Sequence, residues 1–226
     1  MFERTSPAVQ DYLKAIYQLV ADDARGVCAT SSLAGLLDVA PASATNMLKK
    51  LDVMGLVTHV PYRGAALTDA GRGIALEVIR HHRLIETYLA EALGVPWDRV
   101  HDEAEVLEHV LSEDLEERMA AALGYPTMDP HGHPIPPRDG AFGPSGWVAV
   151  TDLAAGQSGV VSQVSDRDPG LLRYLGERGL VPGAEVVVVG TEPFEGPITV
   201  SVAGREHTLG RYAAKDVLVD VPESRG

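Results

Sequence analysis

Cysteine is almost absent from this chain of 226 residues, in which Cys28 is the single example. One thiol excludes a disulfide within the chain and a zinc site built mainly from cysteine. So little cysteine is typical of proteins in a reducing compartment. We therefore expect a cytoplasmic protein.

Long apolar runs are also missing. No stretch approaches the roughly 20 apolar residues that a membrane-spanning helix needs. The first residues, Met1-Phe-Glu-Arg4, do not form a positively charged start followed by an apolar run. The sequence accordingly predicts neither a secretion signal nor a membrane partner.

Positive charge is scarce, with 19 Lys and Arg against 32 Asp and Glu and a formal net charge of −13. This balance argues at first sight against nucleic acid as a partner. Residues 1–75, however, hold seven basic and seven acidic residues, so the whole acidic excess lies after residue 75. A neutral region beside an acidic region that divalent cations would partly neutralise is compatible with metal-controlled DNA binding.

The pattern of apolar residues divides the chain into three segments, 1–75, 76–146 and 147–226. The first contains three helical patterns and a short hairpin. The second contains two amphipathic helices, separated at Gly94-Val95-Pro96, and a linker rich in proline and glycine over 126–146. In the third, β-branched runs at 160–161, 186–189 and 198–202 predict a small β-barrel, with one short helix over 171–175.

The first segment has the pattern of a winged helix-turn-helix. A helix over 30–38 and a turn at Val39-Ala40-Pro41 precede a helix over 42–54, whose N-terminal side chains are small and polar. Hydroxyl and amide groups there suit contacts to base edges, and lysines suit contacts to phosphates. Two short strands around Pro61-Tyr-Arg-Gly64 form the wing. The predicted DNA-contacting residues are Pro41, Ala42, Ser43, Thr45, Asn46, Lys49, Lys50 and, in the wing, Arg63. The alternative is a winged helix used for protein contacts.

The run from Val100 to Val110 has the pattern of a metal site. His101, Glu105, Glu108 and His109 stand at i, i+4, i+7 and i+8, and such positions share one face of a helix. Burying this face without a cation is costly, so a divalent metal is the natural explanation. The alternative is a solvated acidic helix with incidental histidines.

A second set of candidate ligands precedes this run. His82 and Glu86 stand four residues apart and therefore face the same way, and His101 can join them from the next helix. Adjacent His81 points about 100° away on an ideal helix and is expected at the surface.

The order of these features resembles the diphtheria toxin repressor family of metal-dependent repressors over nearly the whole chain. The motifs that carry the resemblance are Asp11-Tyr-Leu-Lys-Ala-Ile-Tyr17, His82-Arg-Leu-Ile-Glu86, Val100-His-Asp-Glu-Ala-Glu-Val-Leu-Glu-His109, His133-Pro-Ile-Pro136 and Leu175-Gly-Glu-Arg-Gly-Leu-Val-Pro-Gly-Ala-Glu-Val186. The resemblance implies a mainly α protein with a small β part. Its domains would be a winged helix-turn-helix over 1–75, a helical metal-binding and dimerisation domain over 76–146, and an SH3-like, FeoA-type barrel over 147–226.

The resemblance also implies two metal sites. Asp11, Glu105, Glu108 and His109 match the primary, DNA-activating site, and His82, Glu86 and His101 match the ancillary site. The ancillary site of such proteins takes a further ligand from the C-terminal module or from the linker. The candidates for it here are Asp129, His131, Asp166 and Asp168.

Three positions indicate the metal. Iron-responsive members carry methionine where this chain has Asp11 and cysteine where it has Glu105. A sulfur-free site of oxygen and imidazole ligands favours Mn²⁺, with Fe²⁺ as the alternative. Lys14 stands where two-domain manganese repressors carry a second carboxylate, which argues against a closely spaced binuclear site at the primary position.

The sequence therefore predicts a homodimeric, Mn²⁺-activated repressor of metal-uptake genes that binds a palindromic DNA operator. It predicts no enzymatic activity and no small organic substrate. A carboxylate-bridged metalloenzyme is the alternative from another class, but such enzymes use paired Glu-x-x-His motifs on four long helices. A metal-independent regulator would leave the clustered ligands without a purpose.

Overall fold

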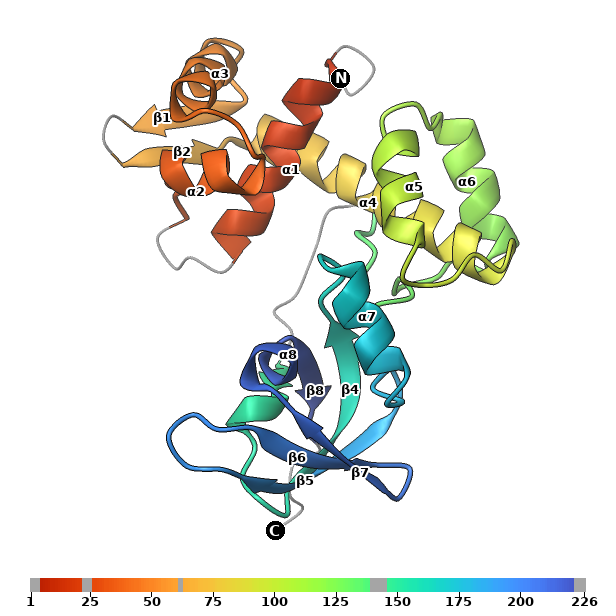
Figure 1. Cartoon of the computed structure of the whole chain (residues 1–226). Helices are drawn as coiled ribbons and strands as arrows, with labels where there is room; N and C mark the ends of the chain where they lie inside the picture. Colours follow the sequence, from red (N-terminus) through yellow and green to blue (C-terminus); the bar gives the residue numbers. More distant parts are fainter. Residues whose placement is uncertain (1–4, 22–25, 61–62, 139–145, 222–226) are drawn as a thin grey trace. The chain divides into compact units, whose positions relative to one another are not determined.

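The computed structural model describes residues 5–21, 26–60, 63–138 and 146–221 (Figure 1). These residues form two compact units. The first consists of residues up to 82 with 107–112 and 136–138, and the second consists of 83–106, 113–135 and 146–221. The division falls inside one continuous helix, α4 (Asp69–Glu91), which also runs through the domain boundary predicted at residues 75 and 76.

The first unit has a winged helix-turn-helix. Helices α1 (Pro7–Ala21), α2 (Thr30–Leu36) and α3 (Pro41–Val53) precede the strands β1 (Val57–Val60) and β2 (Gly64–Leu67), and α4 follows (Figure 1). The two strands pair antiparallel, with Val57 opposite Leu67. Fully buried leucines and isoleucine fill the space between the helices, and they are Leu13, Ile16, Leu33, Leu48 and Leu51.

The second helix of the motif, α3, begins where the sequence predicts. Pro41 occupies its first turn, where the missing backbone N–H costs no hydrogen bond. Ala44, Leu48 and Leu51 recur at spacings of four and three residues, and all three are buried in the core. The opposite face of α3 is therefore left to solvent, with Lys49 and Lys50 exposed on it.

The helical part of the second unit differs from the sequence prediction. The helix expected after Gly94 is two helices, α5 (Val100–Leu107) and α6 (Glu113–Ala122), separated by a turn at residues 108–110. Three acidic residues occupy the first turn of α6, where they interact favourably with the helix dipole and support a new helix start. The prediction that His101, Glu105, Glu108 and His109 share one helical face is therefore wrong.

The C-terminal part of the second unit is an antiparallel sheet with the strand order β3-β8-β4-β5-β6-β7. Its strands are β3 (Val148–Ala149), β4 (Ser158–Val164), β5 (Glu185–Thr191), β6 (Ile198–Val202), β7 (Arg205–Leu209) and β8 (Val217–Asp220). A 3₁₀ turn (Val150–Asp152) and the helices α7 (Pro169–Gly176) and α8 (Arg211–Lys215) complete it. The three predicted β runs and the predicted short helix lie inside β4, β5, β6 and α7.

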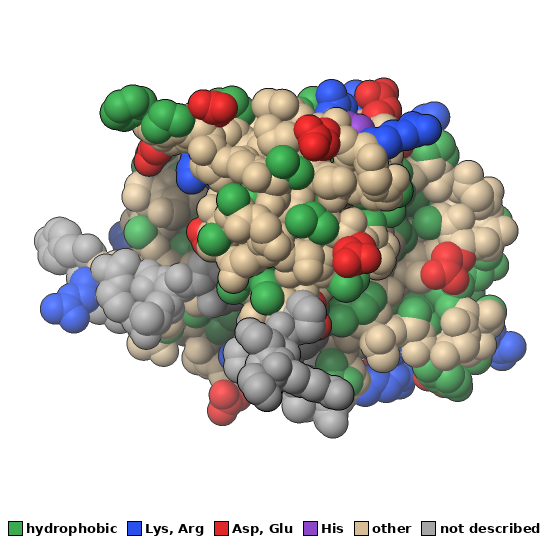
Figure 2. All heavy atoms as spheres, turned by 90° about the horizontal axis from the view of Figure 1, so that it is seen from below, with side chains coloured by type: hydrophobic (Ala, Val, Ile, Leu, Met, Phe, Trp, Pro, Cys, Tyr) green, Lys and Arg blue, Asp and Glu red, His purple; other side chains and the backbone are tan. Residues whose placement is uncertain are grey.

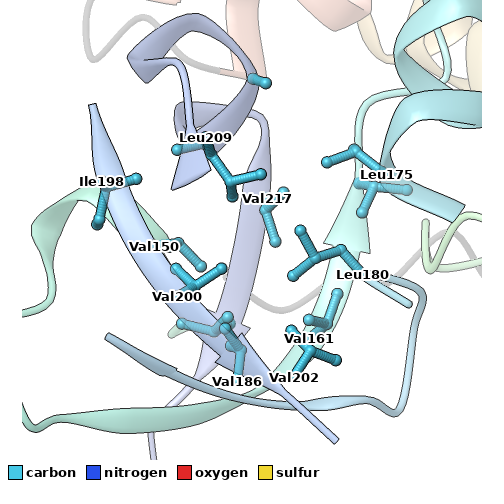
Figure 3. Packing of buried hydrophobic residues seen from close by; sticks show 14 of the residues in the cluster. Val150, Val161, Leu175, Leu180, Val186, Ile198, Val200, Val202, Leu209 and Val217 are labelled. Carbon is cyan, nitrogen blue, oxygen red and sulfur yellow. The ribbon is translucent and has the colours of Figure 1, made fainter. Parts of the chain in front are cut away.

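The core of this sheet domain is almost entirely aliphatic. Val161, Val186, Val200 and Leu209 point toward one another from four strands, and Leu175 of α7 packs into the same cluster (Figure 3). Alternating buried positions along β6 produce this arrangement, because successive side chains of a strand face opposite sides. The predicted fold class, mainly helical with a small SH3-like β domain, is confirmed.

On the face shown in Figure 2, acidic side chains stand singly among apolar and basic ones. Among the described helices, none combines the length and the apolar character needed to cross a bilayer.

Candidate metal centres

The first cluster of potential ligands lies in the first unit and joins α1 to the turn after α5. Asp11, Glu108 and His109 offer ligand atoms that all lie within 4.8 Å of one another. Nε2 of His109 is 3.0 Å from Oδ1 of Asp11 and 3.7 Å from Oε1 of Glu108. We call this group the first centre.

Two neighbours orient the ligands of the first centre. Nδ1 of His109 lies 2.6 Å from Oε1 of Gln10, a buried residue of α1. A ring that donates from Nδ1 keeps the lone pair of Nε2 free for a cation, and an acceptor such as Gln10 fixes the orientation of the ring. His81 is fully buried, contrary to the sequence prediction, and its Nδ1 lies 3.1 Å from the carbonyl oxygen of Glu108. This contact holds the turn in place.

Lys14 adds a positive charge beside the first centre. Its Nζ donates to both carboxylate oxygens of Glu108, at 2.8 and 3.0 Å, and lies 3.2 Å from Nδ1 of His82. Nδ1 of His82 is itself within hydrogen-bond distance of Glu108. The Glu108 side chain is fully buried, so its charge needs these partners.

The second cluster lies in the second unit and joins α4, α5, the linker and the loop after β4. Glu86 of α4 is buried, and its Oε1 lies 3.3 Å from Nδ1 of His101. Oδ2 of Asp166 lies 3.8 Å from the same Nδ1 and also 3.8 Å from Nδ1 of His133. Oε2 of Glu86 lies 3.8 Å from Nδ1 of His131. We call Glu86, His101, Asp129, His131, His133 and Asp166 the second centre.

Asp129 shapes the linker part of the second centre. Its Oδ1 accepts hydrogen bonds from the backbone N–H groups of His131 and His133, at 2.8 and 2.9 Å. Its Oδ2 lies 3.1 Å from Nδ1 of His133. An aspartate that bonds to the backbone two and four residues ahead closes a tight turn, which presents both imidazoles on one side.

His131 has an unusual electrostatic environment. Burial favours the neutral ring, but the facing carboxylates of Glu86 and Asp129 outweigh it and raise the pKa of His131 to about 9. Nε2 lies 2.8 Å from the carbonyl oxygen of Trp97, and the ring stacks on the Trp97 indole at 5.7 Å. Nε2 therefore donates to Trp97, and Nδ1 is the nitrogen that faces Glu86.

The two candidate aspartates of the C-terminal module have different roles. Burial acts to raise the pKa of Asp166, but His133, His101 and His131 outweigh it and hold the pKa below its usual value. Asp168 instead caps α7, where its Oδ1 accepts from the backbone N–H groups of Gly170 and Leu171. Asp166 is therefore the carboxylate of this pair that the structure brings to the other ligands.

Glu105 and His82 are two further predicted metal ligands. Glu105 is half-buried on α5, and its Oε1 lies 3.7 Å from Nε2 of His101. His82 stands one turn before Glu86 on α4 and is buried. Both remain predicted metal ligands.

Most of the predicted DNA-contacting residues are exposed to solvent. The exposed ones are Pro41, Ala42, Ser43, Asn46, Lys49, Lys50 and Arg63. Thr45 is half-buried, and its hydroxyl donates to the carbonyl oxygen of Pro41 at 2.8 Å. Pro61 and Tyr62, at the predicted wing tip, lie outside the described residues.

Sequence reasoning missed two contributors. Gln10 gives no signal in the sequence, because a glutamine on a helix is usually a surface residue. His133 follows His131 at a spacing of two behind Asp129, and this Asp-Pro-His-Gly-His pattern was a usable signal.

The structure combines a winged helix with a cluster of carboxylate and imidazole groups. This combination is typical of metal-responsive DNA-binding proteins. Three family models match consecutive parts of the chain. They are the iron-dependent repressor N-terminal DNA-binding domain at residues 4–65, the iron-dependent repressor metal-binding and dimerisation domain at 68–137, and the FeoA domain at 148–221.

Individual relatives agree with these matches. The iron-dependent repressor IdeR of Mycobacterium tuberculosis is 34% identical over an alignment 223 residues long, and the alignment covers 92% of this chain and 95% of IdeR. The regulator MntR of Oceanobacillus iheyensis is 34% identical over 120 residues, which cover 53% of this chain and 80% of MntR. A solved structure of a manganese-dependent transcriptional repressor in complex with manganese superposes with a TM-score of 0.87 at 38% identity, over 94% of this chain and 99% of the other. The chain belongs to the diphtheria toxin repressor family of iron- and manganese-dependent repressors.

Proposed function

We propose that this protein is a Mn²⁺-activated, DNA-binding repressor of genes for metal uptake and homeostasis. The observation that carries this proposal is the first centre, in which Asp11 of the DNA-binding domain meets Glu108 and His109 of the metal-binding domain. A cation held there would tie the two parts together. Such a regulator works where the DNA is, and we propose that it acts in the cytoplasm.

The donor set supports manganese as the activating ion. The ligands we assign to the first centre are Asp11, Glu105, Glu108 and His109, and none contains sulfur. Hard oxygen ligands with imidazole suit Mn²⁺, which lies at the weak end of the affinity order and must be selected by ligand type and geometry. The similar structure that holds manganese points the same way. Fe²⁺ remains the alternative, because IdeR is named as iron-dependent.

The ligands we assign to the ancillary site are His82, Glu86, His101 and Asp166, with Asp129 and His131 beside them. The fit of this site to a cation rests on Glu86, His101 and Asp166, whose ligand atoms lie within 4.8 Å of one another. Three carboxylates gathered with three imidazoles are the donor set that a divalent ion requires.

The protein's own residues would convert metal binding into DNA binding. A bound divalent cation supplies the positive charge that holds carboxylates and imidazoles from separate segments in one geometry. Asp11 belongs to α1, and the adjacent Leu13 and Ile16 are fully buried in the winged-helix core. Fixing Asp11 therefore fixes the whole DNA-binding domain, including α3.

We propose that the N-terminal half of α3 contacts the bases of the operator DNA. Ser43 and Asn46 are exposed there and suit base edges, while Lys49, Lys50 and Arg63 suit phosphates. We propose that two copies bind a palindromic operator, because a dimer places two such helices on successive half-sites. We further propose that exposed apolar side chains on α5 and α6, Val106 at 71% and Leu115 at 49% exposure, contribute to the dimer surface.

The test is anaerobic DNA binding, measured by mobility shift on fragments of the source genome with chelator, Mn²⁺ or Fe²⁺ at fixed free concentrations. We expect selective retention of a few fragments with Mn²⁺ and loss of retention with chelator. Asp11→Ala should abolish the Mn²⁺ response. Glu103→Ala, which removes an exposed carboxylate on α5, is the matched control and should leave the response unchanged.

Three results would contradict the proposal in different ways. Binding that chelator does not change would indicate a metal-independent regulator. An equal response to Fe²⁺ would keep the repressor and remove the manganese assignment. Retention of no fragment under any condition would reopen the metalloenzyme alternative.

A further inference from the structure

The second centre combines three carboxylates with three imidazoles. Its six side chains form two groups, Glu86 with His101 and Asp166, and Asp129 with His131 and His133. Within each group the ligand atoms lie within 4.8 Å of one another. Ligands of one ion with bonds of about 2.2 Å are at most about 4.4 Å apart, so small side-chain shifts would bring each group to the span of a single ion.

Two carboxylates connect the groups. Glu86 directs Oε1 to His101, at 3.3 Å, and Oε2 to His131, at 3.8 Å. Oδ2 of Asp166 lies 3.8 Å from His101 and 3.8 Å from His133. A carboxylate with one imidazole on each side has the arrangement of a bridge between two ions.

His131 is an independent sign of a ligand in the linker group. Its side chain is completely buried, and its Nδ1 has no hydrogen-bond partner in the described part of the chain. Since Nε2 is engaged by the Trp97 carbonyl, Nδ1 is the nitrogen left to face the carboxylates. A cation between Nδ1 and the facing carboxylates would give this buried nitrogen a direct partner.

The linker is also held firmly enough to present ligands. The carbonyl oxygen of His131 accepts a hydrogen bond from the backbone N–H of Val164 in β4, at 2.9 Å. Gly132 has φ +87°, and a Cβ there would lie 1.9 Å from the carbonyl oxygen of Ser162. Only glycine allows this close approach to β4, so the two histidines on either side of Gly132 are fixed against the sheet domain.

We propose that the second centre holds two divalent cations, one at Glu86, His101 and Asp166 and one at Asp129, His131 and His133, with Glu86 and Asp166 bridging them. The second ion ties the linker to α4. This proposal rests on the proposed function only in taking the protein to bind divalent metal.

The test counts Mn²⁺ ions in a chain whose first centre is disabled by Asp11→Ala and His109→Ala. We expect two ions per chain by equilibrium dialysis with elemental analysis, and a magnetically coupled pair by electron paramagnetic resonance. Adding His133→Ala should leave one ion and an uncoupled spectrum. His207→Ala, which changes a histidine of β7 outside the cluster, is the matched control and should keep two ions.

A single ion in the chain with the disabled first centre would overturn the proposal, as would two ions without magnetic coupling. If His133→Ala does not fold, anomalous diffraction from the wild-type protein decides instead. Two manganese peaks about 3.5–4 Å apart at the second centre support the proposal, and one peak overturns it. The mobility-shift assay tests the proposed function, and the ion count tests the two-ion centre. A protein without Mn²⁺-dependent DNA binding could still hold two ions, so failure of one proposal is distinguishable from failure of the other.

Discussion

Lys14 is the residue from which we predict the number of ions at the first centre. Its ammonium group lies between the buried carboxylate of Glu108 and the imidazole of His82. A cation built into the chain therefore occupies the space that a second metal ion would need. This contact supports the sequence-based expectation of a mononuclear first centre.

Replacing Lys14 tests that role. In Lys14→Glu a carboxylate would stand beside His82 and Glu108, so we expect the number of Mn²⁺ ions at the first centre to rise from one to two. Equilibrium dialysis with the second centre disabled by His101→Ala and His133→Ala measures it. Lys14→Arg keeps the positive charge and should keep one ion, and an unchanged count in Lys14→Glu would contradict the expectation.

Cys28 is a buried thiol whose chemistry follows from its position. It is 2% exposed, and burial raises its pKa to about 11, against an ordinary value of 9.0. The folded chain thus holds this proton more tightly than the unfolded chain. The resulting contribution to stability is complete below pH 9 and is lost as the pH rises through about 11.

We accordingly expect Cys28 to react slowly with a disulfide reagent at pH 7.5, because the thiolate is the reactive form. The absorbance of the released thiol measures the rate. Reaction should become fast in guanidinium chloride, where the thiol is exposed, and should accelerate in the folded protein as the pH approaches 11. Fast stoichiometric reaction of the folded protein at neutral pH would contradict the described burial.

At the scale of elements, two aspartates that stand two residues apart have different roles. Asp168 caps α7, whereas Asp166 is a predicted metal ligand. Asp168→Ala removes the N-cap of α7 and should lower the free energy of unfolding by about 1 kcal/mol. The number of bound ions should not change. Asp166→Ala should differ by losing bound Mn²⁺, because its carboxylate lies beside His101 and His133. Urea unfolding and ion counting on both variants measure the difference, and identical behaviour would contradict the assignment.

Helix α4 offers a second matched pair near its start. A Cβ at Gly71 would lie 1.9 Å from the carbonyl oxygen of Leu56, whereas a Cβ at Gly73 meets no atom within 4 Å. Gly71→Ala should therefore destabilise the DNA-binding domain by about 1–3 kcal/mol or more. Gly73→Ala should stabilise it by about 0.5–1 kcal/mol, because alanine is the better helix former. Thermal unfolding of the two variants measures both signs, and a stabilised Gly71→Ala would contradict the close packing.

At the scale of the whole molecule, metal and DNA are coupled ligands. If Mn²⁺ raises the affinity for operator DNA by a given factor, DNA must raise the affinity for Mn²⁺ by the same factor. We expect a factor of about 5–150, which corresponds to roughly 1–3 kcal/mol. Isothermal titration of Mn²⁺ with and without operator DNA measures it. Equal Mn²⁺ affinities in the two titrations would show that metal binding does not drive DNA binding.

Most of the secondary structure could be predicted from local patterns. The buried stripe of α3, the turn at Pro41 and the β runs of the C-terminal module follow directly from the spacing of apolar residues. The break between α5 and α6 could not, because the amphipathic pattern continues across Glu108 and His109. Tertiary contacts decide it, since Lys14 and His81 hold the side chain and the carbonyl of Glu108.

The sequence by itself determined the fold class, the winged helix and the residue types available for metal binding, since these depend on periodicity and composition. Only the tertiary structure decided how the ligands are grouped. Asp11 and His109 are 98 positions apart in the chain, and His133 and Asp166 are 33 apart, yet each pair lies within 4 Å. Local spacing carries no information on such long-range contacts. The structure therefore placed Asp166, and not Asp168, at the second centre, and it added His133 and Gln10 to the residues around the two clusters.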